Sequence, residues 1–244
     1  MIDSGQLLER FRSLSREIQN GLQSSQKQLE QLKRGSDEIA AERLAGTLDG
    51  ISEAWQDFSG WILISTLDDL NDARANCAPG RVDLQSKIKR SRLRLKNDLD
   101  RNGIRVDTSG VDSLVVETYI PYFEQLLDLL LGNAIKYSPR AGSVEISCSR
   151  NKSGFTIAIQ SIGPIVLKHE TGQLGMAGFR AENAKKLPLT GQGYGLFNCL
   201  RLADLLNASL EFRPEARSLF ETGGVQYANF TIVLTLPDTP EQDG

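Results

Sequence analysis

The segment GQGYGL, residues Gly191–Leu196, has glycine at three alternate positions directly before an apolar stretch that can form a helix. Glycine lets backbone N–H groups turn toward a bound phosphate, and the N-terminus of the following helix adds partial positive charge. Phosphate binding is therefore the chemistry that this loop could perform. Many glycine-rich loops precede a helix without binding anything, so the loop alone leaves a plain turn as the alternative.

A second segment that could do chemistry is QLLDLLLGNAIKYSP, residues Gln125–Pro139. On a helix, Asn133 shares a face with Lys136 and Tyr137, which follow it by three and four positions. A side-chain amide can bind Mg²⁺, an ammonium group can meet a phosphate, and an aromatic ring can lie against a base. The alternative is an ordinary helix that ends at Ser138-Pro139 and packs Tyr137 inside.

In this order, GNAIKYSP, GQGYGL and the terminal NFTIVLTLP resemble the ATP-binding domain of the sensor histidine kinases. That domain is a Bergerat-fold ATPase, related to gyrase, Hsp90 and MutL, and the resemblance covers residues 82–237. It implies an α/β-sandwich domain with a nucleotide pocket and Asn133 as a ligand of Mg²⁺. The residues that the resemblance places at the cofactor are Asn133, Lys136, Tyr137, Ser161, Gly163, Gly191, Gly193, Gly195 and Leu196.

Three positions depart from the pattern of these kinases. Four residues before Asn133 the family has Asn, Asp or Glu at the general-base position, but this chain has Leu129. The family's D-x-G-x-G box corresponds to SIGPI, so Ser161 replaces the adenine-binding aspartate and Ile165 replaces the second glycine. Loss of a charged acceptor costs about 1.5–3 kcal/mol, or roughly ten- to a hundredfold in affinity. The sequence therefore predicts weak binding of ATP or ADP with Mg²⁺, or no cofactor.

The chain has one histidine, His169, in the stretch where the kinases have a lid over the nucleotide. A lone loop histidine is most often a solvated surface residue; an unusual acceptor or a phosphate contact is the alternative. The kinases' acceptor motif, roughly S-H-E-L-R-T-P-L, corresponds best to SREIQNGL, which places Arg16 at the acceptor position. A guanidinium is permanently protonated and cannot accept a phosphoryl group as neutral imidazole can. We therefore expect no autophosphorylation on histidine and assign no catalytic residue.

The second half of the chain must position these segments, and its mixed patterns predict an α+β fold with one helical layer on one mixed sheet. Period-two alternation and the turn at Asn151–Gly154 predict a hairpin. Helices are predicted at 84–99, 121–131 and 196–206. Strands are predicted after the turn at Arg101–Gly103 and at 111–118, 144–148, 155–159, 209–213 and 226–236.

The first half has helical spacing throughout, with apolar residues three and four positions apart. We expect helices at about 4–34 and 37–76, joined by a tight turn at Gly35-Ser36. A second copy would cover the apolar stripe of this antiparallel hairpin in a four-helix bundle; an intramolecular bundle or a stalk on the second domain is the alternative. The hairpin resembles the kinases' dimerisation and phosphoacceptor domain. We predict domains at 1–79 and 80–240 and a homodimer through the N-terminal helices.

Composition excludes several classes of protein. The formal net charge of −3 argues against a dedicated nucleic-acid binder. No apolar run reaches the ~18–20 residues that span a bilayer, so we expect no membrane contact. Three widely spaced cysteines without CxxC favour a reducing cytoplasm over a disulfide framework or structural zinc. The basic run Lys87–Lys96 is most simply a solvated helix face; an acidic partner protein is the alternative.

These features together favour a degenerate histidine-kinase-like signalling protein. We expect an adaptor or pseudokinase in two-component or phosphorelay signalling that binds a response regulator or another phosphorelay protein. The kinases dock such partners near the acceptor, where this chain has Arg12, Arg16, Glu17 and Gln19. Two alternatives stay open: a weak ATP-binding protein kinase or ATPase that acts in trans, and a structural scaffold.

Overall fold

The computed structural model describes residues 77–151, 154–189 and 192–238, with isolated helical positions at Ile18, Gly21, Leu22, Ser25, Thr47, Leu48, Ile51 and Arg74. The chain divides into two compact units, Met1–Asp69 with Thr190–Gln192 and Leu70–Leu189 with Gly193–Gly244. The predicted N-terminal hairpin, Arg16 and Gly191 lie outside the described residues. The four-helix bundle and the boundary at residue 79 therefore stay predictions.

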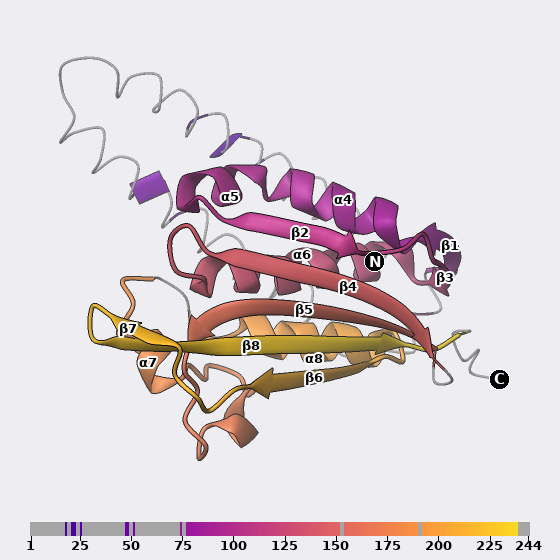
Figure 1. Ribbon diagram of the computed structural model, residues 1–244. Helices are drawn as coiled ribbons and strands as arrows, with labels where there is room; N and C mark the ends of the chain where they lie inside the picture. Colours follow the sequence, from indigo (N-terminus) through magenta and orange to yellow (C-terminus); the bar gives the residue numbers. More distant parts are fainter. Residues whose placement is uncertain are drawn as a thin grey trace, which may run out of the picture. The chain divides into compact units, whose positions relative to one another are not determined.

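A mixed sheet forms the base of the second unit, and its strand order is β2-β4-β5-β8-β6 (Figure 1). Strand β2 runs parallel to β4, and the other neighbours are antiparallel. The short strand β7 (Phe220–Thr222) pairs with β8 alone. The predicted mixed sheet is confirmed, with strands β2 (Arg105–Gly110), β4 (Ser143–Asn151), β5 (Gly154–Pro164), β6 (Ser209–Pro214) and β8 (Val225–Leu236).

Two helices, α6 (Ile120–Tyr137) and α8 (Gly195–Leu205), cover one face of this sheet (Figure 1). Pro121 lies in the first turn of α6, where its missing N–H leaves no helical hydrogen bond unmade. Helix α6 buries a wide apolar stripe: Tyr122, Phe123, Leu126, Leu127, Leu130, Leu131, Ala134 and Ile135. Alternate residues of β4 and β5 bury the facing side of the sheet. The core therefore lies between one helical layer and one sheet, as the α+β prediction states.

The helix predicted at 84–99 is two helices, α4 (Leu84–Arg94) and α5 (Lys96–Asn102). Leu95 separates them with φ −89° and ψ 9°, and Gly103 ends α5 in the left-handed region at φ 64°. Leu84, Ile88 and Ser91 form the buried side of α4. The break lets both helices follow the edge of the domain beside β2 (Figure 1).

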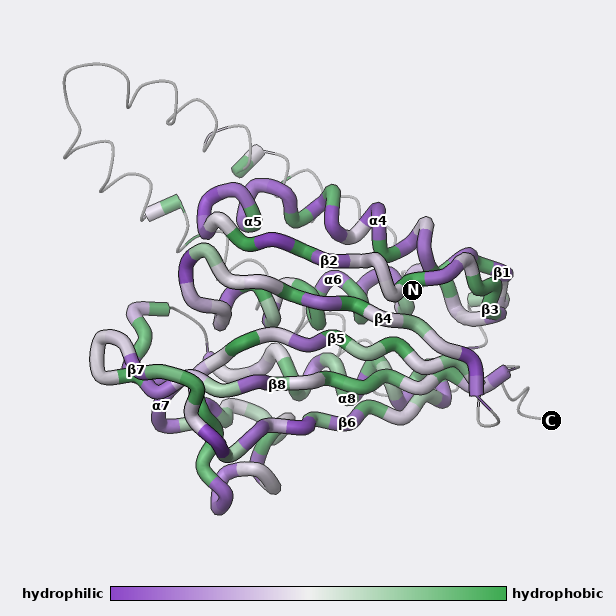
Figure 2. Tube along the Cα trace, in the orientation of Figure 1, coloured by the Kyte–Doolittle hydropathy of each residue, from purple (hydrophilic) through white to green (hydrophobic). Residues whose placement is uncertain are grey.

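The basic run falls on α4 and the start of α5. Lys87 pairs with Glu124 of α6, and Arg94 Nε lies 2.8 Å from Asp128 Oδ2 of the same helix. The other basic side chains are exposed and give this edge its hydrophilic colour in Figure 2: Lys89, Arg90, Arg92 and Lys96. The run therefore fastens α4 to α6 on one side and meets solvent on the other.

Several short elements were not predicted. Strand β1 (Gly80–Asp83) pairs with β3 (Val115–Thr118) in a separate two-stranded sheet, so the predicted strand at 111–118 begins four residues late. The glycine-rich stretch after β5 contains the 3₁₀ helix η1 (Thr171–Gln173) and the one-turn helix α7 (Glu182–Lys185). None of these elements is long enough to show a repeating hydrophobic pattern.

Candidate functional site

A pocket of about 110 Å³ lies between α6, β5, β8, the start of α8 and the segment that follows β5. Most of its wall is apolar, from aliphatic and aromatic side chains. The lining residues are Asn133, Ala134, Tyr137, Ser161, Gly163, Pro164, Val166, Leu174, Gly175, Phe179, Arg180, Ala181, Ala184, Gly193, Gly195, Leu196, Phe230 and Ile232. Seven of the nine predicted cofactor residues are therefore together: Asn133, Tyr137, Ser161, Gly163, Gly193, Gly195 and Leu196.

Asn133, on α6, has a buried side-chain amide with an unpaired donor. Its Nδ2 is buried and has no hydrogen-bond partner among the described residues. A buried, unpaired amide costs about 1–3 kcal/mol, which a bound ligand would recover. The amide lies against Gly195, where an added Cβ would come within 2.9 Å of Asn133 Oδ1. Only glycine at 195 lets α8 begin this close to the amide.

Gly193, in the loop before α8, contacts the segment that covers the pocket, which is residues 167–182. Gly193 has φ +82°, and a Cβ there would lie 2.7 Å from both the carbonyl carbon of Gly178 and the carbonyl oxygen of Phe179. The left-handed conformation and the close contact each require glycine at this position. Gly193 and Phe179 therefore lie together on one side of the pocket.

Strand β5 supplies Ser161 by simple alternation. Ile157, Ile159 and Ser161 are buried on the helix-facing side of the strand, and Ser161 is 7% exposed. The following residues leave this pattern: Gly163 has open space where a Cβ would be, and Ile165 is buried without lining the pocket. Ile165 N donates to Gln226 O at 2.8 Å, so the substituted glycine position is part of the protein core.

Two residues that the sequence singled out lie elsewhere. Neither Lys136 nor Leu129 is among the lining residues, and the contact of Lys136 with a phosphate stays a prediction. Asp128, beside Leu129, is already engaged: it accepts from Ser91 Oγ at 2.5 Å and from Arg94 at 2.9 Å. The carboxylate next to the general-base position therefore holds α4 against α6.

The sequence reading missed Arg180, the charged residue of the lining. Its guanidinium donates to the carbonyl oxygens of Ala184 at 3.0 Å and Leu189 at 3.3 Å. Arginine recognition of phosphate would have been the signal to look for, but residue 180 lies in a stretch with no periodic pattern. Among the lining residues of the described chain there is no Asp, Glu, Lys, His or Cys.

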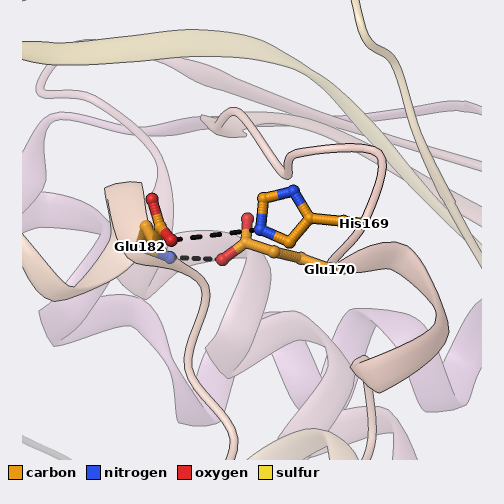
Figure 3. A group of neighbouring side chains, drawn as sticks. All are labelled: His169, Glu170 and Glu182. Atoms are coloured by element: carbon orange, nitrogen blue, oxygen red, sulfur yellow. Dashed lines mark hydrogen bonds and ion pairs between the residues drawn. The ribbon is translucent and has the colours of Figure 1, made fainter.

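Glu170 fastens the two ends of the segment that covers the pocket. It is 3% exposed; its Oε2 accepts from Leu167 N at 2.9 Å, and its Oε1 accepts from Glu182 N at 2.7 Å. His169 is exposed, as predicted, and its Nε2 lies 3.9 Å from Glu182 Oε1 (Figure 3). The sequence reading considered His169 alone and did not anticipate this cluster.

The region that contains the pocket matches a known protein family. Residues 119–240, half of the chain, match the family described as histidine kinase-, DNA gyrase B- and HSP90-like ATPase. The chain belongs to this ATPase family. Membership implies an ATP-binding domain, and the matched region contains α6, the sheet from β4 to β8 and every residue that lines the pocket.

Solved structures share the fold at low sequence identity. The nucleotide-free catalytic domain of histidine kinase ThkA is 17% identical with a TM-score of 0.52, over 66% of this chain and 97% of that one. Histidine kinase AdeS of Acinetobacter baumannii is 15% identical with a TM-score of 0.54, over 88% and 95%. Full-length ShkA in complex with AMPPNP is 18% identical with a TM-score of 0.50, over 96% and 47%. No relative was found among curated proteins.

Within the described part of the chain, no helix is both long enough and apolar enough to cross a bilayer.

Proposed function

We propose that this chain is a histidine-kinase-like signalling protein that acts by association with other proteins and does not phosphorylate itself on histidine. The observation that supports this most strongly is a kinase-type pocket whose described lining contains no carboxylate. Activation of an attacking group requires a general base, and the amide, hydroxyl and guanidinium groups of the lining are poor bases. The absence of any histidine before His169 in the sequence adds a second, independent reason.

The pocket fits a nucleotide better than it fits a catalytic metal. The unpaired amide of Asn133 and the closely packed glycines 193 and 195 suit a ligand with hydrogen-bonding and phosphate groups. Mg²⁺ prefers several oxygen ligands, usually including carboxylates, and the lining offers chiefly the Asn133 amide. ATP or ADP would therefore be held through Asn133 and the loop, weakly and with little dependence on Mg²⁺.

Partners follow from the resemblance to sensor histidine kinases. A homodimer through residues 1–79 and docking of a response regulator, or of another phosphorelay protein, near Arg16 are the arrangement that we propose. Because Arg16 cannot exchange a phosphoryl group, such a partner would be bound without being modified. Pull-down of partners with the full chain, and with a charge-reversed Arg16→Glu variant, separates an adaptor from a plain structural scaffold.

Isothermal titration with ATP and ADP, with and without Mg²⁺, tests the proposal about the pocket. We expect a Kd in the range of about 0.1–1 mM that changes less than about threefold with Mg²⁺. A metal-dependent Kd of about 10 µM or tighter would overturn it. Incubation with γ-labelled ATP should leave the chain unlabelled, and label on the protein would contradict the loss of autokinase activity.

Ser161→Asp tests whether the replaced base contact weakens the nucleotide. Position 161 already faces the pocket, so a carboxylate there can accept from an amino group of the base. We expect ADP to bind about ten- to a hundredfold more tightly. Ser147→Asp is the matched control, because residue 147 is a partly exposed serine of the neighbouring strand β4 and does not line the pocket.

One observation favours a second function. The unpaired Asn133 amide and the glycine loop would also support phosphorylation of a separate protein, in which the substrate supplies the attacking group. Turnover of ATP in the presence of co-purified partners, abolished by Asn133→Ala, would establish that function in place of the adaptor.

A further inference from the structure

Three potential metal ligands converge outside the pocket, where the segment that covers it begins and ends. His169 and Glu170 precede η1, and Glu182 is the first residue of α7. One ligand atom from each of the three residues lies within 4.8 Å of the other two. Figure 3 shows the imidazole and both carboxylates pointing toward one another. Residues that are distant by a dozen positions thus present one nitrogen and two carboxylate oxygens to a common point.

The donor set and spacing suit a divalent cation of the zinc class. Zn²⁺ is bound by His nitrogen and Glu oxygen at about 2.0–2.2 Å, so tetrahedral ligands lie about 3.4 Å apart. His169 Nε2 and Glu182 Oε1 are 3.9 Å apart. Their side chains are 66% and 62% exposed, so small rotations can close the remaining gap and water can complete the coordination.

Glu170 is already held in place by the backbone. Its two oxygens accept from Leu167 N and Glu182 N, and the side chain is 3% exposed. Each carboxylate oxygen has a further lone pair, so these bonds leave room for a metal. Fixed ligands lose little freedom on binding, and such supporting hydrogen bonds are typical of metal sites. The two carboxylates bring negative charge that a divalent cation would offset.

We propose that His169, Glu170 and Glu182 bind a single divalent cation of the zinc class. Its effect follows from its place in the chain. Leu174, Gly175, Phe179, Arg180 and Ala181 line the pocket and lie between the ligands. A metal that joins residues 169 and 170 to residue 182 closes this segment into a loop and restrains the pocket wall. Zinc therefore regulates access to the pocket, whatever ligand the pocket takes.

Titration of the full chain with ZnCl₂, after removal of metal with EDTA, tests the site. We expect one binding event with a Kd of about 1–10 µM, and a loss of at least tenfold in both His169→Ala and Glu182→Gln. Glu221→Gln is the matched control, because Glu221 is an exposed glutamate on β7 and is not one of the three clustered residues. Both test positions are exposed, so the variants should fold, and thermal melting of each metal-free protein checks this.

Trypsin gives a second readout. Lys168 lies directly before the restrained segment, and Arg180 lies within it. Zinc should therefore slow tryptic cleavage after both residues in the wild-type chain but not in His169→Ala. Absence of binding up to about 1 mM ZnCl₂ would overturn the proposal. Binding that survives in both His169→Ala and Glu182→Gln would also overturn it, since the metal would then sit elsewhere, for example at Cys77. In either case the approach of His169 to Glu182 is only a contact between two exposed side chains.

Discussion

The amide of Asn133 and the first residue of α8 are packed so closely that a single methyl group should disturb both. In Gly195→Ala the new Cβ would meet Asn133 Oδ1 at 2.9 Å and Nδ2 at 3.1 Å. Overpacking of this kind costs about 1–3 kcal/mol. We expect a lower free energy of unfolding in urea and, if the pocket binds nucleotide as proposed, loss of detectable ADP binding.

Gly132→Ala is the opposite change on a neighbouring helix. Gly132 lies inside α6, and a Cβ there would have open space around it. Alanine in a helix interior is more stable than glycine by about 0.5–1 kcal/mol. We expect this variant to unfold at higher urea concentration than the wild type. If Gly195→Ala and Gly132→Ala changed the free energy of unfolding equally, contact with Asn133 would not be what requires glycine at position 195.

The cysteines should differ sharply in reactivity. Burial, with a smaller contribution from the Asp112 carboxylate, raises the pKa of Cys148 to about 12. Burial also raises the pKa of the fully enclosed Cys199 thiol, while Cys77 is partly exposed. Because the thiolate is the reactive form, we expect DTNB at pH 8 to modify Cys77 alone in the folded protein and all three residues in guanidinium. Fast reaction of a second thiol would contradict the described packing.

At the scale of elements, the start of α4 depends on one carboxylate. Asp83 Oδ2 accepts from Ser86 N at 3.0 Å and from Ser86 Oγ at 2.7 Å, and its Oδ1 accepts from Ser113 Oγ at 2.9 Å. These bonds, the Ser86 hydroxyl first, lower the pKa of Asp83 below its ordinary value of 3.8. The charged cap therefore stabilises the fold fully above pH 3.8, and this contribution is lost as pH falls through the lower pKa of the folded state.

Asp83→Ala removes this cap. We expect a loss of about 0.5–2 kcal/mol at pH 7 that shrinks as the pH falls below 4. Asp83→Asn is the control, since asparagine also caps helices but does not titrate in this range. Urea unfolding at a series of pH values from 7 to 3 measures both. A loss that does not change with pH would mean that the carboxylate charge contributes nothing.

The long elements were predictable because each repeats its pattern several times. Helix α6 repeats its buried stripe over 18 residues, and β5 alternates buried and more exposed residues over most of its 11 residues. Strands β1 and β3 have only four residues each and are stable through pairing with one another, a long-range contact that no local pattern reports. The break at Leu95 is equally hidden, because the apolar spacing continues through it.

The site was predictable where residue type and spacing recur together, as in Asn133 and Tyr137 on one helix face. Lys136 lies about 100° round the helix from Tyr137 and does not line the pocket, and its contact with a phosphate stays a prediction. Arg180 and Glu170 come from an irregular segment, so their contacts with residues 182–189 could be seen only in three dimensions.

At the scale of the second unit, Arg74 joins two distant parts of the chain. Its Nε donates to Leu205 O at 3.0 Å and its guanidinium to Asp204 O at 2.9 Å, and it also contacts the Asn207 side chain. These carbonyls belong to the last turn of α8, where helices have unpaired acceptors and partial negative charge. Arg74 is thus the C-terminal cap of the helix whose first residue lies at the pocket.

Removal of this cap should be measurable. We expect Arg74→Ala to lower the free energy of unfolding by about 1–2 kcal/mol. Arg217→Ala, at an exposed arginine with no ion pair among the described residues, should leave it unchanged. A fragment that begins at residue 70 should likewise be more stable than one that begins at residue 80. Equal melting temperatures of the two fragments would mean that residues 70–79, with Arg74, do not stabilise the second unit.

The order of strands has a consequence for how the protein is made. Strand β8 comes last in sequence but lies between β5 and β6, and β6 has no other neighbour in the sheet. Residues 209–214 therefore have no neighbouring strand until their partners, residues 230–235, have left the ribosome. At a synthesis rate of about 5–20 residues per second, the sheet is therefore completed only after β8 has been made. A premature stop that removes only β8 would leave β5 and β6 with open edges, exposed to chaperones and proteases.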